Sequence, residues 1–119
     1  MNTALHIPGI VDKVSTTLAS AVVKGRLLID GDMFNGKVVA ELIVAGKKTG
    51  GGVGHLVMYD FKRAEVIKTV TIGDATTTIY IKDLTLNLQK AKLFEFQIYT
   101  DGVGEVLVYN ATLILMPKN

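Results

Sequence analysis

The chain has 119 residues, no cysteine, and 13 basic against 11 acidic side chains, for a net charge of +2. A single domain of this length buries roughly two thirds of its unfolded surface in one core. The near balance of charge argues against a nucleic-acid partner and against an anionic membrane surface. The absence of cysteine excludes disulfides, thiolate metal ligands and a thiol nucleophile.

Residues 1–22 are predicted to form an N-terminal arm followed by a first strand or helical turn. Pro8 and Gly9 stiffen a segment that is otherwise mostly apolar and has no obvious place in a small core. We therefore expect this segment to be held either by its own sheet or by a neighbouring subunit. The residues predicted to form a protein interface are Leu5, Ile7, Pro8, Ile10 and Val11.

Targeting signals are not expected. Polar residues interrupt the N-terminal segment, so it does not have the pattern of a signal peptide. No run of about 18 apolar residues occurs, so no transmembrane helix is predicted.

Apolar residues recur at alternate positions from residue 23 onward, which predicts a β-sandwich domain over residues 23–119. The first inward faces are expected to be Val23, Gly25, Leu27 and Ile29, and then Val38, Ala40, Leu42 and Val44. Asn35-Gly36 predicts a tight turn between these strands. Residues 46–54, in which Lys47 and Lys48 precede four glycines, are predicted to form a flexible loop.

Further alternating segments follow this loop. Strands are expected around Val57 to Phe61 and Val66 to Ile72, then over residues 76–82 with Ile79 and Ile81 inward, and again at Leu84, Leu86 and Leu88. Residues 94–115 read as a β-hairpin that turns at Asp101-Gly102. About eight strands at this spacing favour an all-β fold, an antiparallel and jelly-roll-like β-sandwich, over βαβ units.

The last quarter of the chain carries a resemblance to a known family. Phe94-Glu95-Phe96-Gln97-Ile98-Tyr99, the Gly102-Val103-Gly104 turn and the strand from Val106 to Leu113 resemble the end of a galactose-binding-like β-jelly roll. That family includes carbohydrate-binding modules, and related jelly rolls occur in phage fibres and capsid decoration proteins. The resemblance therefore implies either a virion protein or a glycan-binding module. The lack of tryptophan is a departure from the carbohydrate-binding pattern.

Candidate chemical sites are weak. Gly46-Lys47-Lys48-Thr49 looks like a phosphate-binding loop but lacks the earlier glycine and the following helix. Asp30, Asp32 and Asn35 offer oxygens to calcium, although the short cluster is ordinary turn chemistry. His6 and His55 have no evident partner, and no pair stands out among the carboxylates Glu41, Asp60, Glu65, Asp83, Glu95 and Glu105. We expect no catalytic residue, no cofactor and no metal site.

We therefore expect a non-enzymatic structural protein that assembles into an oligomer, a trimer or larger, or binds capsid or tail proteins. By analogy with related jelly rolls it would be a phage virion component, such as a capsid decoration, head-fibre or tail-associated protein. Outside a virion we expect it in the cytoplasm. The alternative is a carbohydrate-binding module or receptor-binding domain that presents Tyr99 and Tyr109 to a glycan.

Overall fold

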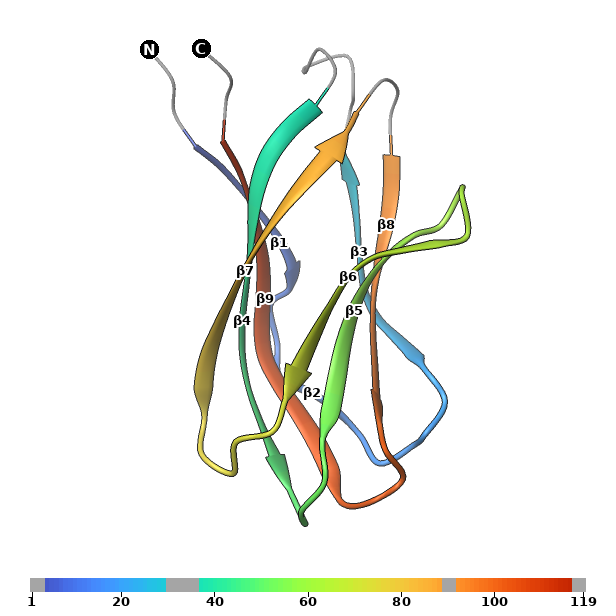
Figure 1. Ribbon diagram of the computed structural model, residues 1–119, viewed down its shortest axis with the longest axis vertical. Coiled ribbons are helices and arrows are strands. Elements are labelled where there is room, and N and C mark those ends of the chain that lie inside the picture. Colours follow the sequence, from blue (N-terminus) through green and yellow to red (C-terminus); the bar gives the residue numbers. More distant parts are fainter. Residues whose placement is uncertain (1–3, 30–36, 89–91, 117–119) are drawn as a thin grey trace.

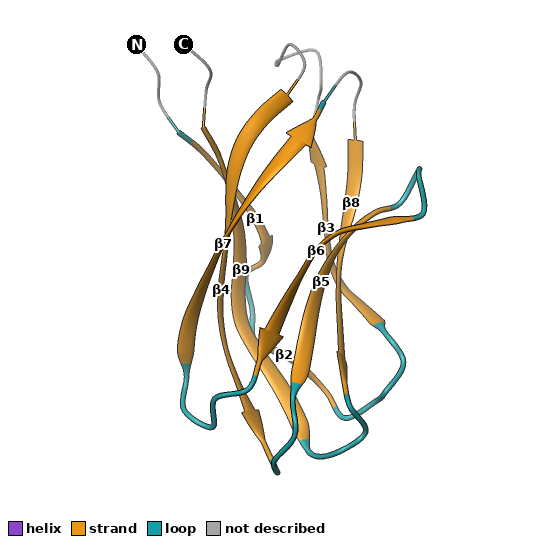
Figure 2. Cartoon of the chain, viewed as in Figure 1, coloured by secondary structure: helices purple, strands orange, loops and turns teal. Residues whose placement is uncertain are grey.

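The computed structural model describes residues 4–29, 37–88 and 92–116, which form strands joined by loops and turns (Figures 1 and 2). Within these ranges there are nine strands and no helix. The strands are β1 (Leu5–Ile10), β2 (Val14–Thr16), β3 (Val22–Ile29), β4 (Lys37–Thr49), β5 (Gly54–Asp60), β6 (Glu65–Ile72), β7 (Thr78–Asn87), β8 (Lys92–Thr100) and β9 (Glu105–Met116). The predicted all-β antiparallel sandwich is confirmed.

The strands form two stacked sheets. One has the order β1-β9-β4-β7, with the short β2 also pairing with β9, and the other has the order β3-β8-β5-β6. Strands from opposite ends of the chain pair in a nested series: β1 with β9, β3 with β8, β4 with β7 and β5 with β6. This is the arrangement of one long hairpin rolled over itself, which defines a jelly roll.

The predicted hairpin over residues 94–115 is wrong. The turn itself is present, with Gly102 and Gly104 at positive φ, but β8 and β9 belong to different sheets. At this turn the Thr100 and Asp101 N–H groups donate to the carbonyls of Leu18 and Val53 rather than to β9. Two successive strands that each have one apolar face can pair edge to edge or stack face to face, and here they stack. Among the nine described strands, β5 and β6 alone are consecutive strands that pair as a hairpin in one sheet.

The core lies between the sheets and confirms most of the predicted inward faces. Val38, Ala40, Leu42 and Val44 of β4 are buried, and Phe94, Phe96 and Ile98 of β8 lie across from them. Leu27 and Ile29 of β3 are also buried, whereas Val23 is exposed because the pairing of β3 with β8 shifts between Val23 and Gly25.

One inward face was predicted with the wrong phase. Ile79 and Ile81 are 65% and 56% exposed. Residues 76–82 and 84–88 were interpreted as two strands, but β7 is continuous from Thr78 to Asn87. Leu84 and Leu86 occupy its inner side, and since side chains alternate along a strand, the odd-numbered isoleucines must point outward.

The predicted loop over residues 46–54 is also wrong in its first half. β4 continues through Lys47 and Lys48 to Thr49, so only residues 50–53 connect β4 to β5. Lys48 falls on the inner side of β4 and is buried. This connection lies near the β8–β9 turn, at the lower end of Figure 1.

The N-terminal segment is held by its own sheet. β1 and β2 both pair antiparallel with β9, so residues 5–16 are strands of the sandwich rather than a free arm. β1 lies at the edge of the sheet, next to β9 alone. The division of the chain at residue 22 stays a prediction.

Candidate functional site

The five residues predicted to form an interface do not share one face. Ile10 is 2% exposed and packs in the core of its own chain. Ile7 packs against that core, and Leu5 is paired with the inward residue Leu115. Pro8 pairs with Thr112 on the outer side of the sheet, and Val11 is exposed just beyond β1.

Apolar side chains gather on the outer side of the β1-β9-β4-β7 sheet. Ile43 of β4 is paired with Ile81 of β7, and Ala45 is paired with Ile79. Val39 of β4, 58% exposed, extends this surface toward one end. We call these five residues the β4–β7 face. Scattered exposed apolar residues are normal, but a contiguous set marks an interaction surface.

The same surface continues across all four strands. Pro8 is paired with Thr112, Thr112 with Ile43, and Ile43 with Ile81, which makes one row from β1 to β7. Pro8 is therefore the one predicted interface residue that lies in line with the β4–β7 face. Sequence reasoning missed this face because it placed Ile79 and Ile81 in the core.

The outer side of the other sheet is more polar. Glu95 of β8 is buried there, where its Oε2 accepts from Arg26 Nε at 3.0 Å and its Oε1 accepts from Gln97 Nε2 at 3.3 Å. His55 and Tyr99 are cross-strand partners whose rings stack with centroids 4.8 Å apart. Leu28 and Val66 are exposed on the outermost strands of this sheet, β3 and β6, and do not form a continuous apolar surface.

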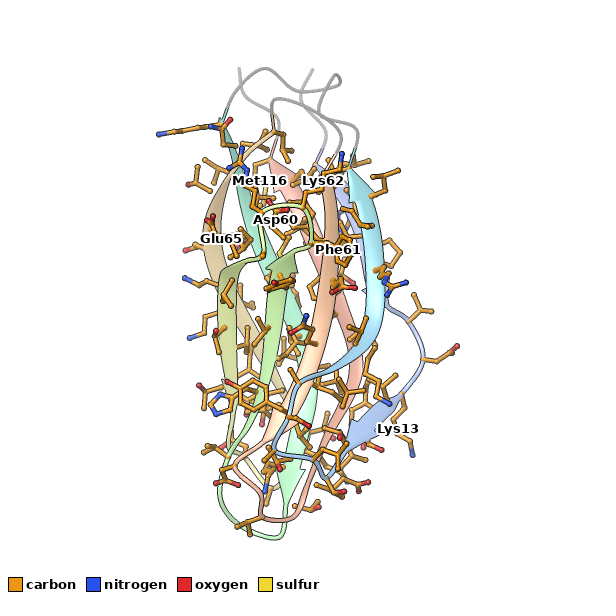
Figure 3. All side chains as sticks on the ribbon, turned by 90° about the vertical axis from the view of Figure 1, so that its right-hand side faces the viewer. Lys13, Asp60, Phe61, Lys62, Glu65 and Met116 are labelled. Atoms are coloured by element: carbon orange, nitrogen blue, oxygen red, sulfur yellow. The ribbon has the colours of Figure 1, made fainter. Side chains whose placement is uncertain are left out.

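Charged groups flank the Ile43 and Ala45 rows of the β4–β7 face on both sides. Glu41 and Asp83 are direct cross-strand neighbours on one side. On the other side, a hydrogen bond with the Thr77 side chain and the nearby Lys47 ammonium lower the pKa of the Tyr109 hydroxyl. Lys13 also contributes to this lowering, and Figure 3 shows its side chain extending away from the body of the molecule.

The two tyrosines predicted as glycan contacts lie on opposite sides of the molecule. Tyr99 is on the outer side of β8 and Tyr109 is on β9, which belongs to the other sheet. They cannot form one binding platform. Only Tyr99 has an aromatic neighbour among the described residues, and it is His55.

Two loops at the lower end of the molecule are joined by Lys48. Its Nζ donates to the carbonyl oxygen of Thr49 at 3.1 Å and to the carbonyls of Gly51 and Val103. Asp101 accepts from the Val53 N–H at 2.9 Å and from the Val103 N–H at 3.2 Å, and these bonds, with Lys48 nearby, lower the pKa of its carboxyl. The two side chains fasten the β4–β5 connection to the β8–β9 turn.

The weak chemical candidates resolve into structural roles. Gly46 to Thr49 is strand rather than a phosphate-binding loop. Asp60 is buried and caps the β5–β6 turn, where its Oδ1 accepts from the N–H groups of Lys62 and Arg63 (Figure 3). Asp30, Asp32 and Asn35, the calcium candidates, lie outside the described residues.

The described ranges hold neither a metal-binding cluster nor a helix that could span a membrane. They contain no group of three or more His, Asp or Glu placed to hold a metal ion. No helix in them has the length and apolar character that crossing a membrane requires.

No protein-family model matches the chain, and no curated protein matches it. Solved structures share its fold at low identity. The T=1 particle derived from infectious bursal virus is 11% identical with a TM-score of 0.64, over 98% of this chain and 32% of that one. The VP2 subviral particle of infectious bursal disease virus is also 11% identical, with a TM-score of 0.57 and the same coverage. The chain spans about a third of the length of these capsid proteins.

A further match is the insecticidal delta-endotoxin Cry8Ea1 of Bacillus thuringiensis, which is 9% identical with a TM-score of 0.58, over 91% of this chain and 20% of that one. At such identities the likeness shows the fold alone. The same sandwich thus occurs in viral capsid proteins and in a toxin. The resemblance to the galactose-binding-like family is not confirmed by these structures.

Proposed function

We propose that this protein is a non-enzymatic structural component that works by self-association. We place it in a virion, as a capsid decoration, head-fibre or tail-associated subunit of a phage. The observation that carries the proposal is the β4–β7 face, where Val39, Ile79 and Ile81 are each more than half exposed. Covering such a surface removes apolar area from water at about 25 cal/mol per Å². The occurrence of the same fold in a viral capsid protein supports the placement.

The test of this function is the mass of the protein in solution as a function of concentration. Sedimentation equilibrium of the wild-type chain is expected to give an oligomer at concentrations near 1 mM or below, and Ile81→Lys is expected to shift it toward monomer. Leu28→Lys is the matched control, because Leu28 is 67% exposed on the other sheet. A wild-type chain that stays monomeric throughout would contradict self-association. The same measurement tests the predicted trimer or larger assembly.

A second function is favoured by the stacked pair on the other sheet. His55 and Tyr99 present partly exposed rings, and the Thr71 hydroxyl lies 3.5 Å from His55 Nδ1. Aromatic faces beside hydroxyl groups suit a sugar. A glycan array followed by calorimetry tests this alternative, in which Tyr99→Ala should abolish binding and Tyr109→Ala should leave it intact. Binding that is lost equally in both variants, or absent from the wild type, would remove this candidate.

A further inference from the structure

The β4–β7 face has a charge pattern that its own chain does not neutralise. Glu41 and Asp83 lie directly opposite each other on neighbouring strands, where like charges repel. The described residues contain a single ion pair, Arg26 with Glu95, so neither carboxylate is paired within them. Lys47 lies on the same side of β4, six residues or about 20 Å away. The two carboxylates therefore lie on one side of the Ile43 and Ala45 rows and Lys47 lies on the other, while Val39 and the exposed Lys37 lie beyond the carboxylates on β4.

Two copies that meet through this face can be related by a two-fold axis that lies in the plane between them. This axis can run either along the strands or across them. With the axis along the strands, each row of residues faces the same row of the partner, so Glu41 and Asp83 would face two further carboxylates. With the axis perpendicular to the strands, each row faces the row at the opposite end. Lys47 of each copy then faces the Glu41 and Asp83 row of the other, so a positive charge lies opposite the two carboxylates at each end.

The side-chain sizes agree with the perpendicular axis. The midpoint between Glu41 and Lys47 falls at residue 44, so this axis passes between the rows of Ile43 and Ala45. The larger Ile43 of each copy then faces the smaller Ala45 of the other, and Ile81 faces Ile79 on β7. Alternating large and small residues across facing positions is what lets two surfaces interdigitate. An axis along the strands, midway between β4 and β7, would also give one contact of isoleucine with alanine and one of isoleucine with isoleucine. The charges, rather than the side-chain sizes, therefore distinguish the two axes.

The size of the contact fits a reversible pair. Five rows across the four strand positions of this sheet, which are β7, β4, β9 and the edge shared by β1 and β2, span about 26 by 19 Å at the spacings of a β-sheet. The area is roughly 1,000 Å² for two copies. Specific interfaces start near this size, at about 1,000 to 1,200 Å². Packed sheets keep their strands within about 30° of alignment, which keeps the rows in register near the centre.

We propose that two copies of this chain pair through the β4–β7 face about a two-fold axis perpendicular to the strands, with Lys47 of each copy opposite Glu41 and Asp83 of the other. This proposal rests on the self-association proposed above and specifies its surface. Glu105 lies one row beyond Lys47 and one strand away, near the apolar Met116 row of the partner. A two-fold contact closes after two copies, so a larger assembly needs a second surface, for which Leu5 and Val11 remain the predicted residues.

The test is a charge-reversal series measured by sedimentation equilibrium near physiological salt. The first variant is Glu41→Lys with Asp83→Lys, the second is Lys47→Glu, and the third combines all three substitutions. Each of the first two places like charges opposite each other at both ends of the contact, so the dissociation constant should rise about tenfold to a hundredfold. The combined variant restores opposite charges and should return to within about threefold of wild type.

Controls separate this proposal from the one on which it rests. Lys62→Glu, on the exposed β5–β6 turn, changes the net charge as Lys47→Glu does and should leave the constant unchanged. Circular dichroism establishes that every variant is folded. The proposed pairing is overturned if the first two variants leave the dissociation constant unchanged, or if the combined variant does not restore it. Self-association itself would still stand. A wild-type chain that is monomeric up to about 1 mM overturns both.

Discussion

Lys48 places a buried ammonium group between two loops. The side chain is 2% exposed, and the carbonyls of Thr49, Gly51 and Val103 accept its hydrogen bonds. Lys48→Met keeps the length of the side chain but removes the donors, so the three carbonyls lose the ammonium group that joins them. We expect the free energy of unfolding in urea to fall by about 1–3 kcal/mol. Lys82→Met, at an exposed position of β7, is the control and should have little effect. Equal stability of the two variants would contradict the role of Lys48.

Asp101 makes the stability of the same loops depend on pH. Its hydrogen bonds from Val53 and Val103, with Lys48 nearby, hold the pKa of its carboxyl below the ordinary value of 3.8. The unfolded chain therefore binds this proton more readily than the folded chain does. The stabilisation is present above about pH 5 and is lost as the pH falls through and below the ordinary pKa.

The corresponding prediction compares Asp101→Asn with wild type over about pH 2.5 to 7. We expect the difference in thermal midpoint to be largest near neutral pH and to shrink below pH 4. Asp12→Asn, at an exposed position, is the control. Its difference in thermal midpoint from wild type should not show this dependence on pH. A difference for Asp101→Asn that is constant with pH would show that the carboxylate charge contributes nothing.

At the scale of elements, the sandwich closes along one side because two glycines allow β1 to approach β3 and β8. A Cβ added at Gly25 of β3 would clash with the carbonyl oxygen of Gly9, and one added at Gly9 would clash with the Phe96 ring. Gly25→Ala should therefore push β1 away from β3 and destabilise the fold by about 1–3 kcal/mol. Hydrogen exchange should show faster exchange in β1 and the adjoining part of β9.

The control for this variant is Gly73→Ala. A Cβ at Gly73 would contact Val53 Cγ1 at 3.6 Å, an ordinary van der Waals distance. We expect it to change stability by much less than Gly25→Ala does. If Gly25→Ala leaves both the unfolding midpoint and the exchange of β1 unchanged, the close approach of β1 and β3 is not a determinant of the fold.

The sequence predicts an element well where residues close in the chain determine which side of it faces the core. It predicts less where strands distant in the chain determine the pairing. Alternation identifies the core side of Val38 to Val44 because Glu41 is the one polar residue there and places its own side of the strand outward. It fails for Ile79 and Ile81, since β7 is apolar on both sides and its phase is decided by Leu84 and Leu86. The turn at Asp101-Gly102 was predictable from its residues, but its crossing between sheets depends on pairing partners far away in the chain.

The candidate site was harder to predict than the fold for the same reason. Pro8, Ile43 and Ile81 are separated by tens of residues and become one row only through the pairings of β1, β9, β4 and β7. A lysine that follows a strand pattern and precedes several glycines reads as a loop residue. Lys48 is instead the last inward side chain of β4, because carbonyls from two loops replace the water that its ammonium group needs.

At the scale of the whole molecule, the two outer faces differ in what they leave for other molecules. The β3-β8-β5-β6 sheet satisfies its buried Glu95 with Arg26 and Gln97 from the same chain. The β1-β9-β4-β7 sheet leaves apolar rows and separated charges on its outer side. Rolling the chain into a jelly roll thus produces one face whose buried charge is paired within a single copy and one that leaves apolar rows exposed, which the proposed pairing would cover.

Self-association of this kind links stability to protein concentration. Because the folded pair dissociates on unfolding, its thermal midpoint rises with concentration once that exceeds the dissociation constant. Typical unfolding entropies for two chains of 119 residues give a rise of about 3 °C for each tenfold increase in concentration. Scanning calorimetry from about 10 µM to 1 mM should show this slope for wild type and for Leu28→Lys. Ile81→Lys should show a flat profile, and a flat wild-type profile would mean that the β4–β7 face stays uncovered in the folded protein.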